Sequence, residues 1–267
     1  MKTVSVNGID VAYQESGSGP PLLLLHGFSL DHTIWAPQVE TLQRSYRLLV
    51  PDLRGMGRTP HTEGPISVAM MADDMAAFLG ALDITAAAVA GFSLGGYILL
   101  EMVLRHPLKV RACGFISTRA TADTEEGKKV RLQHMQTVID EGMAGFAGHF
   151  IESLFAPAYI ASHPLEIEAT QKVVLSQIPD YIASLIDALR RREELTPRLG
   201  EITVPCAVFG GTGDALVPHA QMTALHEGLS DSVIELVEGA GHTTPFECAD
   251  RVSFQLDQMM QRAGMWM

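Results

Sequence analysis

A serine between glycines is the first residue of this chain placed to do chemistry. The segment Gly91-Phe92-Ser93-Leu94-Gly95 follows a run of small apolar residues at 86–90, which predicts a buried strand, and leads into a helical pattern over 94–104. A serine on such a strand-to-helix turn takes a strained backbone conformation that lifts its hydroxyl clear of the sheet. The motif is short, so a glycine-rich turn with an idle serine is the alternative, and the flanking elements favour a nucleophile.

A serine hydroxyl is a weak nucleophile at neutral pH and needs an adjacent base, which a third group orients. Of the ten histidines, His242 is the best placed, because it follows the last predicted strand in a loop, 239–247, that glycines and a proline keep irregular. Asp214 follows the preceding strand in the same way and would hold the imidazole in the right tautomer. Ser93, Asp214 and His242 are therefore the candidate nucleophile, acid and base.

The acid has one rival. Asp123 lies just past the strand predicted to end at Ser117. Asp214, for its part, could serve only as a turn residue that caps its glycine loop, since aspartate side chains often bond the backbone two residues on. The sequence leaves these interpretations open, because a triad is recognised by its geometry.

Negative charge that develops on a substrate oxygen needs preorganised donors, often backbone N–H groups. One candidate is the amide of Leu94, directly after the nucleophile, and the other should come from the loop after the third strand, His26-Gly27-Phe28. His26 itself is expected to hold this loop by hydrogen bonds, because buried histidines are usually structural groups whose bonds are satisfied.

The whole chain sets limits on the class of protein. Its 267 residues are enough for one large α/β domain with a subdomain, and no apolar run approaches the roughly 18 residues that span a bilayer. A net charge of −12 with scattered Lys and Arg argues against a nucleic-acid surface. The one dense basic run, Arg190-Arg191-Arg192, is followed by two glutamates and predicts a solvated helix face.

The three cysteines, Cys113, Cys206 and Cys248, are far apart in apolar surroundings and show neither metal-ligand spacing nor a disulfide framework. The N-terminal residues enter a strand pattern directly and lack the regions of a signal peptide. We therefore expect a cytoplasmic protein with reduced cysteines, whose partner is a small molecule rather than a membrane or a nucleic acid.

Around these residues the chain alternates strands and helices. A hairpin is predicted over 3–13 around Asn7-Gly8, followed by buried strands at 22–25, 46–50, 86–90, 110–117, 206–210 and 232–237. The alternation breaks once, where four helical patterns follow one another at 127–141, 143–155, 165–177 and 179–194. Ligands of open α/β sheets bind at the carboxyl ends of the strands, so an insert that leaves from that edge would cover the site as a lid.

Five blocks of this chain together resemble the α/β-hydrolase superfamily, and the likeness covers nearly the whole chain outside the helical insert. The blocks are His26-Gly27-Phe28, Asp52 to Thr59, Gly91 to Gly96, Gly213-Asp214 and Gly241-His242. The resemblance implies a mostly parallel, twisted sheet of eight strands with helices on both faces. It also implies a core domain of residues 1–123 and 196–267 and a helical cap of residues 124–195.

For the site, the resemblance implies Ser93 as nucleophile, Asp214 as acid, His242 as base, and the amides of Phe28 and Leu94 as the oxyanion hole. Asp52 and Arg54 usually brace a loop in such proteins and receive no catalytic role. The implied reaction is hydrolysis of carboxylic esters or lactones through an acyl-enzyme, with neither metal nor cofactor.

Within the superfamily the chain is most similar to small carboxylesterases and 3-oxoadipate enol-lactonase-like hydrolases, through Arg105-His106-Pro107 and Ala122-Asp123-Thr124. Haloalkane dehalogenases and epoxide hydrolases carry Asp at the elbow, where this chain has Ser93. The remaining alternatives depart from the chain in smaller ways. Cofactor-free haloperoxidases, which are perhydrolases, typically carry Trp in place of Phe28. Carbon–carbon bond hydrolases usually have a more glycine-rich oxyanion loop than this chain. Slow-turnover ligand receptors usually have a Gly-His-Ser-Val elbow, where this chain has Gly-Phe-Ser-Leu.

The helical cap is expected to choose the substrate. Some of its apolar side chains are candidates to line an acyl pocket, since flexible methionines adapt to varied shapes. They are Met135, Met143, Phe146, Phe150, Leu154 and Phe155. For any single one of them, packing of the cap helices on one another is the alternative. No arginine is placed to clamp a substrate carboxylate, so nothing in the sequence favours a strictly anionic substrate.

Overall fold

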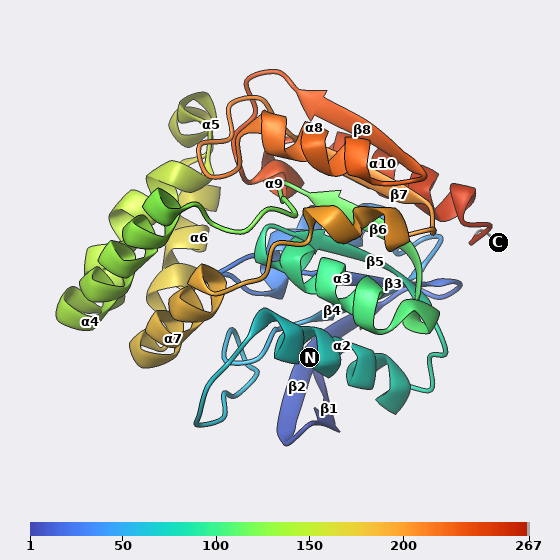
Figure 1. The fold of residues 1–267 in the computed structure, drawn as a ribbon, viewed down its shortest axis with the longest axis horizontal. Coiled ribbons are helices and arrows are strands. Elements are labelled where there is room, and N and C mark those ends of the chain that lie inside the picture. Colours follow the sequence, from blue (N-terminus) through green and yellow to red (C-terminus); the bar gives the residue numbers. More distant parts are fainter. Residues whose placement is uncertain (266–267) are drawn as a thin grey trace.

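Eight strands form one sheet in the order β1-β2-β4-β3-β5-β6-β7-β8 (Figure 1). The computed structural model describes residues 1–265. The strands are β1 Lys2–Val6, β2 Ile9–Ser16, β3 Pro21–Leu25, β4 Arg47–Pro51, β5 Ala87–Phe92, β6 Val110–Ile116, β7 Cys206–Gly211 and β8 Ser232–Val237. Strands β3 to β8 run parallel, whereas β2 pairs antiparallel with both β1 and β4, so the predicted mostly parallel sheet is confirmed.

The hairpin of β1 and β2 turns at Asn7 and Gly8, which both have positive φ, 46° and 78°. Val6 pairs with Ile9 across this two-residue turn. Asn-Gly suits such a turn, because both central residues need the left-handed backbone that these two residue types tolerate. The sequence therefore predicts this turn correctly.

Helices cover both faces of the sheet. Those outside the insert are α1 Ala36–Leu42, α2 Val68–Ala81, α3 Leu94–Arg105, α8 His219–Gly228, α9 Thr244–Glu247 and α10 Ala249–Arg262, with short 3-10 helices η1 His32–Trp35, η2 Pro107–Lys109 and η3 Thr196–Glu201. Helix α1 packs against α10, and α2 packs against α3 on the opposite face (Figure 1). Between them, strands β3 to β7 are buried apart from Pro21, Arg47 and Arg111, which explains their continuous apolar runs, whereas the edge strand β8 is only partly buried.

Four helices follow one another between β6 and η3 and form the helical insert, on the left in Figure 1. They are α4 Glu125–Leu154, α5 Pro157–Ser162, α6 Pro164–Leu175 and α7 Pro179–Arg190. Helix α4 kinks at Gly142, whose φ of 67° is not helical, so the two helical patterns predicted on either side of it meet there. Helix α5 is too short for its period to stand out in the sequence. The division of the chain into a cap of residues 124–195 and a core of residues 1–123 and 196–267 stays a prediction. Residues 266–267 of that core lie outside the described residues.

One local prediction is wrong. The loop expected over 239–247 contains helix α9, which begins at Thr244 with Pro245 in its first turn. Proline is tolerated there because the first N–H groups of a helix have no intrahelical acceptor, and its fixed φ suits the helix. His242 itself stays in the non-helical part of the segment.

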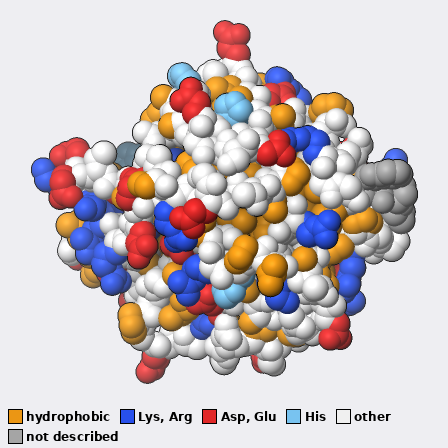
Figure 2. Space-filling model, turned by 45° about the vertical axis from the view of Figure 1, so that its right-hand side comes forward, with side chains coloured by type: hydrophobic (Ala, Val, Ile, Leu, Met, Phe, Trp, Pro, Cys, Tyr) orange, Lys and Arg blue, Asp and Glu red, His pale blue; other side chains and the backbone are white. Residues whose placement is uncertain are grey.

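Charged side chains of both signs share the surface. On the face drawn in Figure 2, Lys and Arg side chains are interspersed with Asp, Glu and apolar side chains instead of forming a continuous stripe. Over residues 1–265, no helix combines the length and the apolar character that a membrane crossing requires. All three cysteines are free. Cys113 and Cys206 lie opposite each other on the neighbouring strands β6 and β7, although they are far apart in sequence.

Candidate active site

Ser93 stands at the turn between β5 and α3 with a left-handed backbone, φ 53° and ψ −110°. Such a conformation costs a serine about 1–3 kcal/mol and persists only where the surroundings fix it. The Ser93 N–H donates to the carbonyl of Ile116 at 2.9 Å, and the Ser93 carbonyl accepts from Thr118 Oγ1 and from the Gly96 N–H, both at 2.9 Å. Strand β6 and the first turn of α3 therefore hold the elbow in shape.

Two glycines let the backbone make this turn. A Cβ on Gly91 would lie 2.1 Å from the carbonyl oxygen of Gly95, and a Cβ on Gly95 would lie 2.3 Å from that of Leu25. Both obstacles are backbone atoms, which no side-chain rotation can move. The Gly-x-Ser-x-Gly spacing is thus a steric requirement of the crossing from strand to helix.

His242 and Asp214 form a buried pair. His242 Nδ1 lies 2.7 Å from Asp214 Oδ2, and neither side chain is more than 1% exposed. Asp214 Oδ1 accepts the N–H groups of Leu216 and Val217, both at 2.8 Å. Asp214 is therefore a turn residue and the histidine's partner at once, because the turn fixes one oxygen and leaves the other facing the imidazole. With the proton on Nδ1, the Nε2 atom of His242 is free to accept a proton.

The loops that carry this pair are bonded to each other at the end of the sheet. The Gly213 N–H donates to the Ala240 carbonyl at 2.9 Å, and the Gly239 N–H donates to Thr212 Oγ1 at 2.9 Å. Since β7 and β8 are neighbours in parallel register, their following loops start side by side. Asp214 and His242, 28 residues apart in sequence, meet for this reason.

The imidazole also reaches the elbow. Its ring centroid lies 5.1 Å from that of Phe92, the residue before Ser93. Within residues 1–265, no hydrogen bond joins the Ser93 hydroxyl to His242, and catalytic bonds of this kind often tighten only when substrate binds. The structure thus brings His242 and Asp214 into contact and sets the histidine beside the strand end that carries Ser93.

Asp123, the rival acid, has other partners. Arg119 Nη2 lies 2.6 Å and Arg192 Nη1 2.7 Å from Asp123 Oδ1, and Arg131 bonds the second oxygen. Burial acts to raise the pKa of Asp123, but the charges and hydrogen bonds of Arg131 and Arg192 outweigh it and lower the pKa to about 2. Asp123 is thus the ionised centre of an arginine cluster at the start of the insert, while His242 bonds Asp214.

Arg192 corrects the expected solvated face at 190–192. Its side chain is only 5% exposed, and its guanidinium carbon lies 4.5 Å from the ring centroid of Tyr97 in α3. Arg190 and Arg191 do pair with Asp187 on their own helix and are more exposed. Arg192 differs because it lies just past the end of α7, where the chain returns to the core and meets Asp123.

The loop after β3, expected to supply one oxyanion donor, is fixed by His26. The Nδ1 atom donates to the Gly27 carbonyl at 2.8 Å, and Nε2 accepts the Leu53 N–H at 2.9 Å. Burial lowers the pKa of His26, which keeps the ring neutral, as an accepting Nε2 requires. These bonds agree with the structural role predicted for His26.

The two predicted oxyanion amides leave the sheet at adjacent strand ends. Leu25, at the end of β3, pairs with Gly91 of β5, so the loop that holds Phe28 starts beside the elbow. Leu94 is the first residue of α3, where a helix leaves its N–H groups without intrahelical acceptors and carries the positive end of its dipole. Their function as an oxyanion hole stays a prediction.

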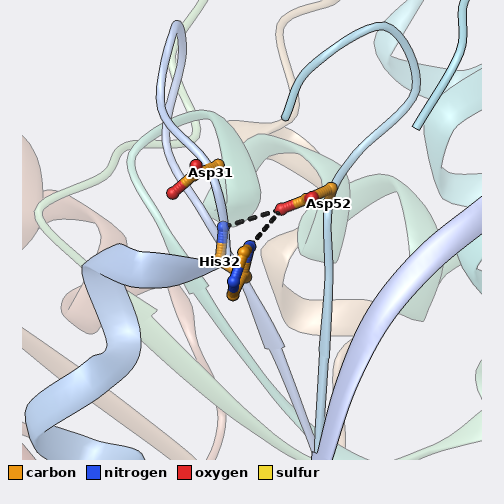
Figure 3. Close-up of side chains that lie close together, drawn as sticks. All are labelled: Asp31, His32 and Asp52. Atoms are coloured by element: carbon orange, nitrogen blue, oxygen red, sulfur yellow. Dashed lines mark hydrogen bonds and ion pairs between the residues drawn. The ribbon is translucent and has the colours of Figure 1, made fainter. Parts of the chain in front are cut away.

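A second bond set, of which the sequence pointed to Asp52 but not to His32, holds the same loop. Asp52 Oδ1 accepts from the N–H of His32 at 2.9 Å and from His32 Nδ1 at 2.7 Å (Figure 3). Asp52 Oδ2 accepts the Arg58 N–H at 2.9 Å. Burial acts to raise the pKa of Asp52, but these bonds outweigh it and lower the pKa, and the bond to Asp52 raises that of His32. Asp31 lies nearby and accepts from Thr33 at the start of η1.

The side chains of Asp31, His32 and Asp52 lie close enough together to offer three ligand atoms to a metal ion. The Nδ1 atom of His32 is occupied as a donor to Asp52, and both Asp52 oxygens already accept N–H groups. A cation would have to break the bonds that hold η1 to the loop after β4. The cluster is therefore a brace, and it agrees with the bracing role expected of Asp52. Arg54 braces separately, with two bonds of 2.7 Å to the buried Asp74.

Two of the predicted pocket residues reach the loop that holds Phe28. The ring of Phe28 packs edge-on against Phe146 and Phe150, with centroid distances of 6.1 and 5.6 Å. Leu154 and Phe155 lie at the end of α4, where the Leu154 carbonyl accepts the N–H of Thr243, next to His242. The other two, Met135 and Met143, are half-buried and buried in the apolar core, and their place in a pocket stays a prediction.

A cavity of about 260 Å³ lies between the core and helix α6 of the insert. It is lined by Leu30, Asp31, Thr33, Ile34, Glu166, Ala169, Thr170, Val173 and Phe246, a mainly apolar set that includes none of the six predicted pocket residues. The lining comes from residues 30–34, which lead into η1, and from helices α6 and α9, three segments that no local pattern connects. Leu30 is two residues from Phe28, and Phe246 is four residues from His242, so part of the lining comes from the same two segments as these candidate site residues.

Comparison with known proteins places this arrangement in a family. A family model described as the alpha/beta hydrolase fold matches residues 20–247. The chain belongs to the α/β-hydrolase fold family. It is 30% identical to a protein of Azorhizobium caulinodans named "Putative carbamate hydrolase RutD", over 87% of this chain and 88% of that one.

Two solved structures of α/β hydrolases have the same fold. An esterase from Thermogutta terrifontis superposes with a TM-score of 0.91 at 30% identity, covering 98% of this chain and 97% of that one. The enol-lactonase from Burkholderia xenovorans LB400 also gives a TM-score of 0.91, at 25% identity, covering 97% of this chain and all (100%) of that one. The resemblance to esterase-like and enol-lactonase-like hydrolases is thereby confirmed, and these relatives support hydrolase activity.

Proposed function

We propose that this α/β hydrolase cleaves carboxylic esters or lactones that carry no charged group. Ser93 would be the nucleophile, His242 the base, and Asp214 the group that orients the base. The observation that carries the proposal is the buried bond of 2.7 Å between His242 Nδ1 and Asp214 Oδ2, beside a serine held at a strained elbow. Strain at a nucleophilic residue is characteristic of functional sites, because folding alone gains nothing from it.

The reaction would proceed in two acyl-transfer steps. His242 Nε2 takes the Ser93 hydroxyl proton while Ser93 Oγ bonds to the substrate carbonyl carbon, and the carbonyl π electrons move to its oxygen. The amides of Phe28 and Leu94 would hold that oxyanion. As the carbonyl re-forms, the C–O bond to the alcohol breaks, and the leaving oxygen takes the proton from His242. A water, deprotonated by the same nitrogen, then attacks the acyl carbon and releases the acid with Ser93 restored.

The helical insert would serve as the cap that selects the substrate. Phe146 and Phe150 face the oxyanion loop through Phe28, which puts their rings next to the position where an acyl group would be held. The cavity beside α6 offers a further mainly apolar space of about 260 Å³, close to the lower end of the volumes of small-molecule sites. Both features support a small substrate with apolar groups.

Charge in the cap supports an uncharged substrate. Every Lys and Arg side chain between residues 124 and 195 lies in an ion pair with a carboxylate of the chain: Lys128, Lys129, Arg131, Lys172, Arg190, Arg191 and Arg192. The cavity lining adds two carboxylates, Asp31 and Glu166, and no cation. A substrate carboxylate would therefore meet like charges without a compensating partner.

The proposal is tested with purified wild type, Ser93→Ala and, as a matched control, Ser230→Ala. Ser230 is exposed and lies just before β8, whereas His242 follows that strand. We expect Ser93→Ala to lower kcat on p-nitrophenyl butyrate by at least about 10⁴-fold with an unchanged circular dichroism spectrum, and Ser230→Ala to match wild type. Turnover near that of wild type in Ser93→Ala would refute the nucleophile.

Substrate class is tested on the same enzyme with a matched panel. We expect kcat of at least about 1 per second on some neutral ester or lactone, and a kcat/KM at least about tenfold lower for mono-p-nitrophenyl succinate than for p-nitrophenyl butyrate, since tenfold corresponds to only 1.4 kcal/mol of charge repulsion. An aryl carbamate belongs in the panel because of the name of the Azorhizobium relative. A preference for the succinate, or for the carbamate, would overturn the assigned class.

A further inference from the structure

Glu247, five residues after His242, contacts two backbone segments that are far apart in the chain. Its Oε2 atom accepts the N–H of Gly241 at 2.8 Å and the N–H of Ala156 at 3.2 Å. Gly241 precedes the histidine, and Ala156 lies just past the end of helix α4 in the insert. A single carboxylate oxygen thus bonds the histidine loop to the insert.

The residue on the other side of His242 is bonded to the same part of the insert. Thr243 donates both its N–H, at 2.9 Å, and its hydroxyl, at 2.7 Å, to the carbonyl of Leu154. The two backbones also touch at Gly241, where a Cβ would lie 2.4 Å from the nitrogen of Ala156. His242 therefore stands between two residues that are both fixed to segment 154–156.

This arrangement separates the two constraints on the histidine. Asp214 holds the ring through Nδ1, whereas the bonds of Gly241 and Thr243 hold the backbone from which the ring extends. Segment 154–156 leads from α4, whose Phe146 and Phe150 pack on Phe28 of the oxyanion loop. Any shift of α4 that moves the substrate-facing rings would be passed to the backbone of His242 through these bonds.

Resting on the proposed function, we propose that Glu247 is a positioning residue that locks the His242 backbone to the end of α4, so that the base is aligned with Ser93 only when the cap is seated. The bonds require an acceptor at Oε2 and make no use of the other oxygen, since Glu247 Oε1 is buried with no hydrogen-bond partner among the described residues. Burial raises the pKa of Glu247, so its surroundings also accommodate a neutral acceptor. A glutamine can supply that acceptor, and an alanine cannot.

The test compares Glu247→Ala, Glu247→Gln and the control Glu152→Ala, an exposed glutamate near the same end of α4. Reactive Ser93 is titrated with a fluorophosphonate, so that kcat is counted per competent site and lost folding is not mistaken for lost chemistry. We expect Glu247→Ala to lower kcat on p-nitrophenyl butyrate by up to about 100-fold, the effect of misplacing a catalytic group by an ångström, with KM changed less than about threefold. Glu247→Gln should keep kcat within about threefold of wild type, as should Glu152→Ala.

An unchanged kcat per titrated site in Glu247→Ala would overturn the proposal. A Glu247→Gln variant as impaired as Glu247→Ala would also overturn it, because the charge of Glu247 would then matter and its acceptor geometry would not. Hydrogen exchange supplies a readout independent of turnover. The amides of Gly241 and Ala156 should exchange faster together in Glu247→Ala and keep their protection in Glu247→Gln. If wild type hydrolyses no ester, the proposed function fails, while joint deprotection of the two amides still supports the lock and unchanged protection refutes it.

Discussion

Asp123 and Asp214 both follow strands of the sheet, and the structure predicts opposite consequences for replacing each by asparagine. The side chain of Asp123 is 2% exposed and is surrounded by Arg119, Arg131 and Arg192, which it binds as a carboxylate. The pKa of Asp123 falls from an ordinary 3.8 to about 2 in the folded protein. At 1.36 kcal/mol per unit, that difference makes the charge worth about 2 kcal/mol of folding free energy near neutral pH.

The sign fixes the pH range in which this contribution acts. Because the folded-state pKa is the lower one, the stabilisation is complete above the ordinary pKa of 3.8 and is lost as the pH falls through about 2. Asp123→Asn should therefore lower the free energy of unfolding by about 2 kcal/mol at pH 7, and its stability should decline less than that of wild type between pH 4 and pH 2. Urea denaturation followed by circular dichroism measures both quantities.

Activity separates the two aspartates. Asp123→Asn should keep kcat near wild type at temperatures where it is folded, since no bond connects Asp123 to His242 in the described residues. Asp214→Asn keeps an oxygen for the turn at Leu216 but cannot hold the imidazole in the same tautomer, so kcat should fall by about 10⁴-fold. A large loss of kcat in Asp123→Asn with unchanged stability, and an active Asp214→Asn, would refute this assignment of the two side chains.

Two further predictions concern the turn at Ser93 and the helical insert. Gly95→Ala, whose Cβ would lie 2.3 Å from the Leu25 carbonyl oxygen, should lower the free energy of unfolding by about 1–3 kcal/mol or abolish folding. The control in thermal melts is Gly148→Ala, whose Cβ would have nothing within 4 Å and which should be neutral or slightly stabilising. Equal melting temperatures for the two variants would contradict the steric argument. Phe150→Ala removes a ring whose centroid lies 5.6 Å from that of Phe28 and should lower kcat/KM on longer acyl esters by about tenfold, whereas Phe254→Ala, at an exposed position, should not. The measurement is kcat/KM on p-nitrophenyl esters of increasing acyl length. An unchanged dependence on acyl length in Phe150→Ala would mean that Phe150 does not contact the acyl group.

Local rules made much of the fold predictable. The strands from β3 to β7 are almost entirely buried and show continuous apolar runs, while Asn7-Gly8 marks the hairpin and Ser67 caps α2 with its hydroxyl. The break of α4 at Gly142 also follows from one residue's backbone preference. Helix α5 and the helical turn at Thr244 were missed because each is a few residues long, and a period needs several turns to stand out.

The sequence by itself determined which residues stand at strand ends. Ser93, Asp214 and His242 each follow a strand whose pattern is unambiguous, and glycines at 91 and 95 are required by contacts within a few residues or at the adjacent strand. Such features are readable because they depend on local geometry. They were sufficient to propose Ser93 as the nucleophile and His242 as the base, but they left the acid open between two aspartates.

Tertiary structure alone decided which distant groups meet. Asp123 became an ion-pair centre because arginines from three positions converge on it, and one of them was expected to face solvent. The His32–Asp52 brace, the cavity beside α6 and the bonds of Glu247 likewise join segments from separate parts of the chain. A side chain's partner depends on how whole elements pack, and that packing is set by the sum of many burial contacts, so no stretch of sequence near Glu247 records that it bonds Ala156.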